Sequence, residues 1–374
     1  MEEVQELQLH VKDGEEEASS SPRVLHSVPP KRGWKWWGLV ALNIIFLVSG
    51  QSVGNLLGRF YYDKGGNSIW MATLVQSAGF PILLLLLPLY LFPFSSTPSS
   101  PASNLKSPSI STLAFIYIFL GLLAAGDNTM YSYGLLYLPV STYSLICATQ
   151  LGFNVVFSYF LNSQKLTPLI LNSVVLLTFS ATLLAGHSDD SSGLPGVSPR
   201  KHALGIVFTL AASAAYALLL SLAQLSFQKI IRAEGFGVVF RFQFFSSFVT
   251  TSACVVGLFA SGEWRELKGE MEGFKKGKVS YVMTLVWTAL GWQLCSIGTF
   301  GLIFQVSSLF TNVIGTLALP VVPVLAVVFF NDKMDAVKVM ALLMALWGFA
   351  SYIYQNYLDQ FRSKKRPPDH RSSL

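Results

Sequence analysis

Charged residues are scarce in this chain: Asp, Glu, Lys and Arg make up only 12% of its 374 residues. Soluble domains carry about 25% charged residues, so this deficit excludes an ordinary globular protein. The basic residues lie mainly in the tails and between apolar runs, so the net charge of +6 does not indicate nucleic-acid binding. The chain is instead 52% hydrophobic with a mean hydropathy of +0.50, which indicates a multi-pass membrane protein.

Metal-ligating and catalytic side chains are equally sparse in the apolar part of the chain. All five histidines lie in tails, in loops or at a helix edge, so no imidazole relay is available at membrane depth. The three cysteines, Cys147, Cys254 and Cys295, show no metal-ligand spacing and are expected to pack as small apolar groups. No P-loop pattern occurs, which argues against direct ATP drive. We therefore expect neither an enzyme nor a cofactor.

Long apolar runs are abundant. A helix that crosses a bilayer needs about 20 apolar residues. The segments that meet this length cover residues 36–58, 68–92, 113–137, 140–161, 166–186, 203–228, 236–261, 279–304, 308–330 and 335–357. The sequence thus predicts an all-α membrane protein with ten transmembrane helices in the lipid bilayer. Residues 36–357 would form the membrane domain, flanked by a disordered cytosolic tail over 1–35 and a cytosolic tail over 358–374.

A short motif recurs between the two halves of the chain. Tyr133–Tyr137 reads YGLLY, and Phe300–Phe304 reads FGLIF. The match relates the third predicted helix to the eighth, so each unit has five helices. Because five is odd, the second copy must insert with the opposite orientation, which predicts inverted repeats over 36–186 and 203–357. Lys and Arg near the membrane ends favour cytosolic termini.

One acidic residue, Asp127, lies well inside a predicted membrane helix and is followed by Asn128. An ionisable group costs several kcal/mol in hydrocarbon, so it usually faces the bundle interior and marks a transport pathway. Protonation would remove the charge, which makes Asp127 a candidate proton-coupling residue. The alternative is a structural role at a helix end. The helix division expected at Leu138-Pro139 places Asp127 near mid-helix, which favours function.

Amides and aromatic rings are the other distinctive side chains at membrane depth. Gln51 and Asn55 are four residues apart, as are Gln150 and Asn154, so each pair shares one helix face. The candidate substrate-binding residues are Gln51, Asn55, Asn128, Tyr131, Gln150, Asn154, Trp292 and Gln293. Such amides serve equally often as hydrogen-bonding glue between helices. Stacking rings with pairing amides would suit a small, flat, largely neutral heterocycle.

Several longer motifs are typical of a known family. They include GQS at Gly50–Ser52, RFYYDKGG at Arg59–Gly66, LVQSAGFP at Leu74–Pro81, YSYGLLYLPVSTYSLI at Tyr131–Ile146 and LWGFASYIY at Leu346–Tyr354. In these motifs the sequence strongly resembles the plant purine permease family of the drug/metabolite transporter superfamily. The resemblance extends from about Trp36 to Tyr357 and leaves out only the tails.

The resemblance implies ten helices in two inverted repeats around a central cavity. It implies proton-coupled uptake of adenine, other purine derivatives and cytokinins, in the plasma membrane or else the tonoplast or endoplasmic reticulum. By motif, the residues expected near the cavity are Gln51, Asp127, Asn128, Tyr131 and Gln150. The resemblance gives less support to Trp292 and Gln293, because family members differ in the residues of the eighth helix.

Other functions stay open at this point. An exchanger of nucleotide sugars or phosphorylated metabolites would need cationic residues in its cavity, and only Arg59 and Arg241, near helix ends, are available. A carrier of another small heterocycle and a ligand sensor that does not transport both fit the composition. Vesicle flux would separate a sensor from a carrier. The sequence leaves the oligomeric state open.

Overall fold

The computed structural model describes residues 33–86, 109–138, 143, 146–164, 166–187, 198–231, 236–318 and 336–365. Within these ranges every regular element is a helix, which confirms the all-helical fold class. The chain divides into two units, Met1–Leu39 and Val40–Leu374. The first unit contributes the beginning of the first helix, where Trp34 and Trp37 are exposed. Everything below concerns the second unit, and residues 1–32 of the tail predicted over 1–35 lie outside the described residues.

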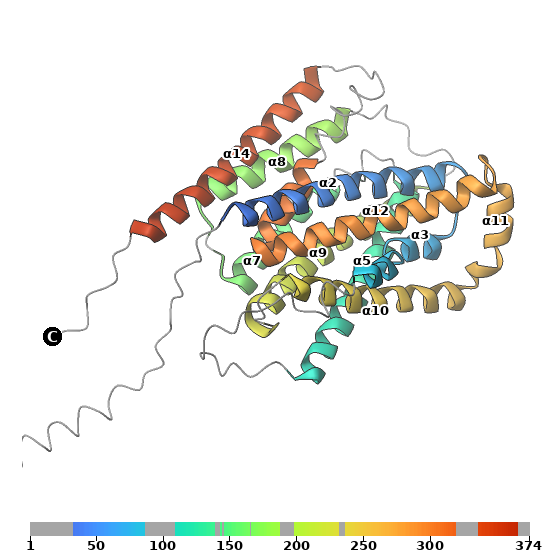
Figure 1. Ribbon diagram of the computed structural model, residues 1–374. Coiled ribbons are helices and arrows are strands. Elements are labelled where there is room, and N and C mark those ends of the chain that lie inside the picture. The colour runs from blue at the N-terminus through green and yellow to red at the C-terminus, as the bar shows by residue number, and fades with distance from the viewer. Residues whose placement is uncertain are drawn as a thin grey trace, which may run out of the picture. The chain divides into compact units, whose positions relative to one another are not determined.

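Figure 1 shows the helices, coloured in chain order from blue at the N-terminus to red at the C-terminus. In order they are α2 (Trp34–Asp63), α3 (Ile69–Val75), the 3-10 helix η1 (Phe80–Leu86), α5 (Ile110–Tyr137), α7 (Gln150–Asn162), α8 (Pro168–His187), α9 (Pro199–Leu225), the π-helix η2 (Ser226–Ile231), α10 (Gly237–Ser261), η3 (Glu263–Arg265), α11 (Leu267–Gly273), α12 (Lys278–Gln305), a helix over Ser308–Ala318, and α14 (Ala336–Lys365).

Five of these helices are long and apolar enough to cross a membrane by length and composition. They are Trp34–Asp63, Ile110–Tyr137, Pro199–Ile231, Gly237–Ser261 and Lys278–Gln305. They coincide with the first, third, sixth, seventh and eighth of the expected spans. Shorter apolar helices occupy described parts of the second, fifth, ninth and tenth. The arrangement as ten helices in two inverted repeats stays a prediction, because residues 87–92 and 319–330 lie outside the described ranges.

The second expected helix, residues 68–92, is not continuous. It begins after Ser68, whose hydroxyl accepts a hydrogen bond from the Met71 backbone N at 3.0 Å and caps α3. The α-helix stops at Val75, a turn follows, and a 3-10 helix resumes at Phe80. Pro81 has no backbone N–H to donate, so it cannot continue the α-helical pattern of the preceding turn. The break therefore interrupts this segment at Gln76.

Two other boundaries differ from the expected ones. The helix expected over 140–161 is interrupted, because the described residues 143 and 146–148 are helical, a turn follows at Thr149, and α7 begins at Gln150. Residues 140–142 and 144–145 of that expected helix lie outside the described ranges. At the other end of the chain α14 continues to Lys365, so the helix extends into the segment expected to be a tail from residue 358. Polar residues after Tyr357 ended the predicted helix too early.

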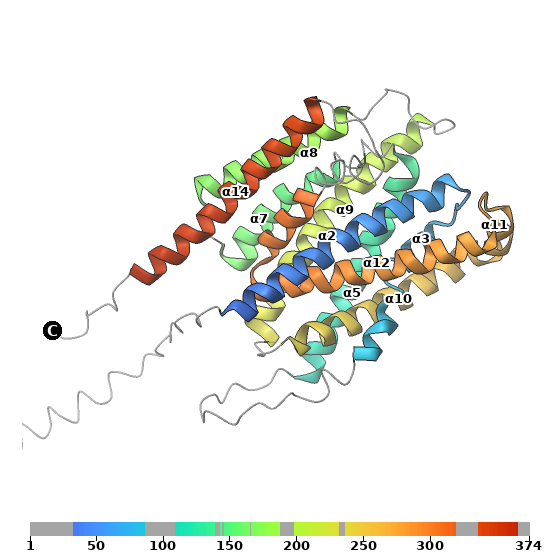
Figure 2. The ribbon, with the colours of Figure 1, turned by 45° about the horizontal axis from the view of Figure 1, so that its top comes forward.

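The helix α5 lies at the centre of the helix contacts, packed against α9, α10 and α3. The helices α7 and α9 also pack together, and α10 and α12 do so beside them. The helices α8 and α14 pack chiefly on each other, as both views show (Figure 2). Their contact includes a hydrogen bond of 2.6 Å from the Ser180 hydroxyl to the Ala341 carbonyl.

The helices α2 and α12 approach each other closely along a seam of glycines. An added Cβ at Gly298 would lie 2.5 Å from both the Asn43 carbonyl oxygen and the Leu47 backbone N. One at Gly50 would meet the Gly291 carbonyl and the backbone of Cys295. Small residues at such positions let membrane helices approach to backbone contact. The seam fixes how α12 presents its side chains to α2.

The seam predicts a steep cost for a side chain at Gly298. In Gly298→Val the added methyl groups would push α2 and α12 apart, and overpacking of this kind costs about 1–3 kcal/mol. Thermal unfolding of the detergent-purified protein should show the loss as a lower Tm. Gly152→Val is the matched control, because an added Cβ at Gly152 has no heavy atom within 4 Å. Equal Tm values for the two variants would contradict the role of the seam.

Candidate functional site

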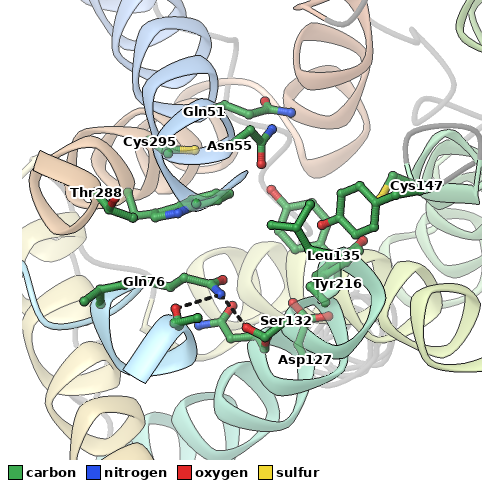
Figure 3. Close-up of a pocket in the computed structure, with 18 of the residues that line it drawn as sticks. Gln51, Asn55, Gln76, Asp127, Ser132, Leu135, Cys147, Tyr216, Thr288 and Cys295 are labelled. Atoms are coloured by element: carbon green, nitrogen blue, oxygen red, sulfur yellow. Dashed lines mark hydrogen bonds between the residues drawn. The ribbon is translucent and has the colours of Figure 1, made fainter. Parts of the chain in front are cut away.

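A cavity of about 140 Å³ lies among α2, α3, α5, α9, α12 and the helix Ser308–Ala318. An apolar cavity of roughly 150 Å³ is enough to hold benzene, so this one suits a small ring system. Its wall combines amide side chains, aromatic rings and one carboxylate (Figure 3). We call this candidate binding site the substrate cavity.

Amide side chains reach the substrate cavity from opposite walls. Gln51 and Asn55 project from α2 on one side, and Gln76 lies across from them (Figure 3). The Nε2 atom of Gln76 donates to the Ser132 hydroxyl at 3.1 Å and to the Ala72 carbonyl at 3.3 Å. The break after α3 therefore turns an amide, held by α5, toward the cavity.

A second group of amides joins α5, α7 and the helix Ser308–Ala318. The Tyr131 hydroxyl donates to Oε1 of Gln150 at 3.3 Å, and Nδ2 of Asn312 donates to the Gln150 carbonyl at 3.2 Å. Among the described residues, Oδ1 of Asn312 has no hydrogen-bond partner, although Asn312 is buried. A buried acceptor without a partner is costly. Because Asn312 is a lining residue, this oxygen is a candidate acceptor for a polar group in the cavity.

The ring of Trp292 forms one wall of the substrate cavity because α2 has a glycine beneath it. An added Cβ at Gly54 would lie 2.6 Å from Cε2 of the indole. With no side chain at Gly54, the ring rests directly against α2. Tyr131 and Tyr143 add two more rings, with centroids 6.1 Å apart in an edge-to-face arrangement. These rings offer apolar faces to a flat ligand.

Among the described lining residues, Asp127 supplies the only carboxylate. Its side chain is 3% exposed, and its Oδ1 has no hydrogen-bond partner among the described residues. The titratable groups that interact with its charge are Tyr131, Tyr143, Cys147 and Tyr216. Among the described lining residues none is Lys, Arg or His, so no cation offsets a negative charge on Asp127.

Most of the residues expected at the site line this one cavity. They are Gln51, Asn55, Asp127, Asn128, Tyr131, Gln150 and Trp292. Asn154 and Gln293 do not line it. Asn154 is fully buried, and its Nδ2 donates to the Ala217 carbonyl at 3.1 Å and to the Ser221 hydroxyl at 3.4 Å. It therefore joins α7 to α9, the glue role that amides often take in membrane helices.

Several lining residues do not belong to the candidate substrate-binding set. Those outside the candidate set include Tyr61, Tyr62, Gln76, Ser132, Tyr143, Cys147, Tyr216, Thr288, Cys295, Thr311 and Asn312. A usable signal existed on α12, where Thr288, Trp292 and Cys295 follow the four-then-three spacing of one helix face. That face excludes Gln293, which the structure buries at 2% exposure against the Gly79 turn. No comparable pattern in the sequence predicts the break after α3, which orients Gln76 toward the cavity.

Two glutamates from the α10–α12 connection hold the α2–α3 connection, and we call this contact the carboxylate clasp. Glu270 Oε1 accepts from the hydroxyls of Tyr61 and Tyr281, the latter at 3.0 Å. Its Oε2 accepts from the backbone N of Asn67 and of Ser68, each at 3.0 Å. Because Tyr61 also lines the substrate cavity, the clasp reaches the end of that cavity.

The second half of the clasp is Glu263. Its Oε2 accepts from the Ser68 hydroxyl at 2.6 Å and from the Trp70 backbone N at 3.1 Å. Both glutamates thus bind orphan N–H groups at the beginning of α3, where the helix dipole also favours a negative charge. The clasp ties two connections that lie about 200 residues apart in sequence, as the separation of 202 between Ser68 and Glu270 shows.

Known proteins share this sequence over most of its length. A family model described as purine nucleobase transmembrane transport matches residues 38–362. "Probable purine permease 11" of Arabidopsis thaliana is 59% identical, over 89% of this chain and 86% of that protein. "Purine permease 21" of the same plant is 50% identical, over 96% of this chain and 93% of that protein.

A solved protein structure supports the fold independently. One crystal structure aligns with a TM-score of 0.57 over 86% of this chain and 97% of its own, at 16% identity. At that identity the likeness concerns the arrangement of helices alone.

Removal of one clasp carboxylate should loosen both connections. In Glu270→Gln the charge-assisted bonds to two hydroxyls and two backbone N–H groups weaken, at a cost of about 1–3 kcal/mol. Hydrogen exchange of the amides at 64–68 and 263–277 should accelerate in the variant. Glu272→Gln is the matched control, because Glu272 makes only an exposed ion pair with Lys278 at 3.1 Å. Similar exchange in both variants would refute the clasp.

Proposed function

This chain belongs to the purine permease family, and we propose that it carries purine nucleobases and their derivatives, cytokinins included, across a membrane. It is an integral membrane transporter and not an enzyme, as its named relatives are permeases. The observation that carries the choice of substrate is the wall of the substrate cavity. Amides and ring faces surround a small cavity, and none of its described lining residues is cationic.

The cavity wall matches what a purine base requires. A base stacked on an aromatic ring gains about 1–3 kcal/mol, and Trp292 offers such a ring. Amides of Asn and Gln pair with the donor and acceptor edge of adenine, and Gln51, Asn55 and Gln76 face the cavity from two walls. A phosphorylated substrate is disfavoured, because two negative charges beside Asp127 would have no counterion.

Proton coupling through Asp127 is the second part of the proposal. With its carboxylate charged, Asp127 leaves an uncompensated charge in a buried site, which costs several kcal/mol. A proton from the acidic side removes that charge. In this proposal the protonated carrier binds substrate and closes, and loss of the proton on the neutral side favours release and return. The direction of uptake is then set by the proton gradient.

Alternating access would require one end of the cavity to open at a time. With cytosolic termini, the α2–α3 and α10–α12 connections lie on the non-cytosolic side. The carboxylate clasp between them is therefore the candidate outer gate of the proposal. We place the carrier in the plasma membrane, where the clasp would face the outside medium. A non-transporting sensor is the alternative, and it would bind purines without flux.

Uptake of radiolabelled adenine in yeast lacking its own purine uptake tests the proposal. We expect uptake to rise as the external pH falls, because more carriers then hold a proton on Asp127, and we expect a protonophore to abolish the rise. Asp127→Asn, which mimics the neutral side chain, should lose the pH dependence. Uptake of trans-zeatin, measured in the same assay, tests transport of a cytokinin.

Equal pH dependence of wild type and Asp127→Asn would contradict the proton-coupling role. Absence of any uptake by wild type, with surface expression confirmed, would contradict transport of these substrates. Purified protein that binds adenine but gives no flux in vesicles would favour the sensor.

The stacking role predicts a large effect for one tryptophan of α12 and none for another. Trp292→Leu should raise the KM for adenine by about 5- to 150-fold, the equivalent of roughly 1–3 kcal/mol of lost stacking. Trp287→Leu is the matched control, since Trp287 is 57% exposed on the outside of the same helix. That variant should stay within about twofold of wild type. A normal KM in Trp292→Leu would contradict the stacking wall.

A further inference from the structure

A second cavity, of about 100 Å³, lies beside the substrate cavity among α5, α9, α10 and α12. The two cavities share part of their walls. The shared residues are Gln76, Asp127, Asn128, Tyr216, Trp292 and Cys295. Asp127 thus borders both cavities, although the substrate argument uses only the first.

The cavities extend in opposite directions from Asp127. Along α5 the substrate cavity takes lining residues after Asp127, up to Leu135, whereas the second cavity takes residues before it, down to Leu120. Along α12 the substrate cavity begins at Leu285, and the second cavity reaches Phe300. With cytosolic termini, the second cavity therefore lies on the cytosolic side of Asp127.

The wall contributed by α10 is polar and has unused hydrogen-bonding atoms. Gln243 is 2% exposed; its Nε2 donates to the Ser247 hydroxyl at 2.9 Å, and its Oε1 has no partner among the described residues. The hydroxyl of Ser246, 7% exposed, also has none. Asp127 and Thr299 line the same cavity, and Oδ1 of Asp127 and Oγ1 of Thr299 also lack a partner among the described residues, which makes four buried oxygens of this kind on its lining residues. Native proteins seldom leave such atoms unsatisfied, and water is their usual partner.

The size of the second cavity suits a short chain of water molecules. At about 30 Å³ for each molecule, a cavity of about 100 Å³ holds roughly three. The titratable lining residues besides Asp127 are Tyr216 and Cys295, and among the described lining residues none is cationic. The charged residue on α10, Arg241, is exposed at the beginning of that helix. A water chain here would touch one acid and otherwise neutral groups.

We propose that the second cavity is a water-filled proton-exit chamber through which Asp127 releases its proton toward the cytosol, separately from the substrate. This inference rests on the proposed proton-coupled transport. The carboxylic acid of Asp127 gives its proton to an adjacent water and becomes a carboxylate. The proton then moves along the hydrogen-bonded waters held by Gln243 and Ser246, and a proton from the outer side later restores the acid.

A separate exit would let Asp127 release its proton while substrate is bound. A base that fills the substrate cavity displaces the water there, so Asp127 cannot exchange its proton through that cavity while substrate is bound. An aromatic cluster lies on the cytosolic side of the second cavity and includes its lining residues Phe242 and Phe300, with ring centroids 5.0 Å apart. Phe227 packs on Phe242 at 4.8 Å and on Phe304 at 5.6 Å. Movement of this cluster would connect the chamber to the cytosol.

Reconstituted vesicles with a pH dye inside test the exit chamber. One assay follows proton entry driven by external adenine, which requires Asp127 to lose its proton inside. The other follows exchange of labelled for unlabelled adenine at equal pH, which proceeds while Asp127 keeps its proton. Gln243→Met keeps the side-chain length but removes both polar atoms, and Ser246→Ala removes the second oxygen. Ser252→Ala is the matched control, since the Ser252 hydroxyl is exposed on α10 and bonds its own helix at 2.8 Å.

We expect Gln243→Met and Ser246→Ala to slow adenine-driven proton entry about tenfold, the effect of one lost strong hydrogen bond in the relay. Exchange should stay within about twofold of wild type, which also shows that the variants fold. Wild-type proton entry in both variants would overturn the exit chamber and leave the proposed function standing. Absence of adenine-driven proton entry in wild type would overturn the proton-coupled function, and this inference with it. Parallel loss of exchange and proton entry would place Gln243 in substrate transport and overturn its role in proton exit.

Discussion

A lone carboxylate buried among helices is the constraint on which the rest of the site depends. Asp127 is 3% exposed, and among the described residues neither a cation nor a hydrogen-bond donor is aimed at its Oδ1. Such a group is costly when charged and tolerable when neutral. Its two protonation states therefore favour different surroundings, and a bundle with two alternative openings can use that difference. In the proposed function, the amide and ring walls select the molecule that occupies the space beside it.

Two kinds of contact hold the helices around this carboxylate, one rigid and one that water can replace. The glycine seam between α2 and α12 brings backbone against backbone, so these two helices and the Trp292 ring behave as one wall. The carboxylate clasp is different, because each of its bonds joins a polar connection and can be exchanged for water. Rigid helices with hydrogen-bonded ends are suited to rocking about a fixed site. The break after α3 adds an amide, Gln76, at the point where both cavities meet.

Much of this site could be predicted from the sequence, for physical reasons that also explain the omissions. Asp127 and the Gln51–Asn55 pair stand out because polar groups at membrane depth are expensive. The same rule cannot separate a cavity amide from a glue amide, and Asn154 proved to bond α9 instead. Helix breaks depend on backbone packing, as at Gly79, and hydropathy does not register them. The clasp joins loops far apart in sequence, which local patterns cannot pair.

The central claim is that substrate binding and protonation of Asp127 are one coupled event. Titration calorimetry of adenine binding to the purified protein, in buffers of different ionisation enthalpy, measures the protons taken up with each substrate. We predict uptake of close to one proton per adenine above the pH at which Asp127 is already protonated, and none for Asp127→Asn. Adenine binding without proton uptake over the whole accessible pH range would contradict the claim, as would equal uptake by the variant.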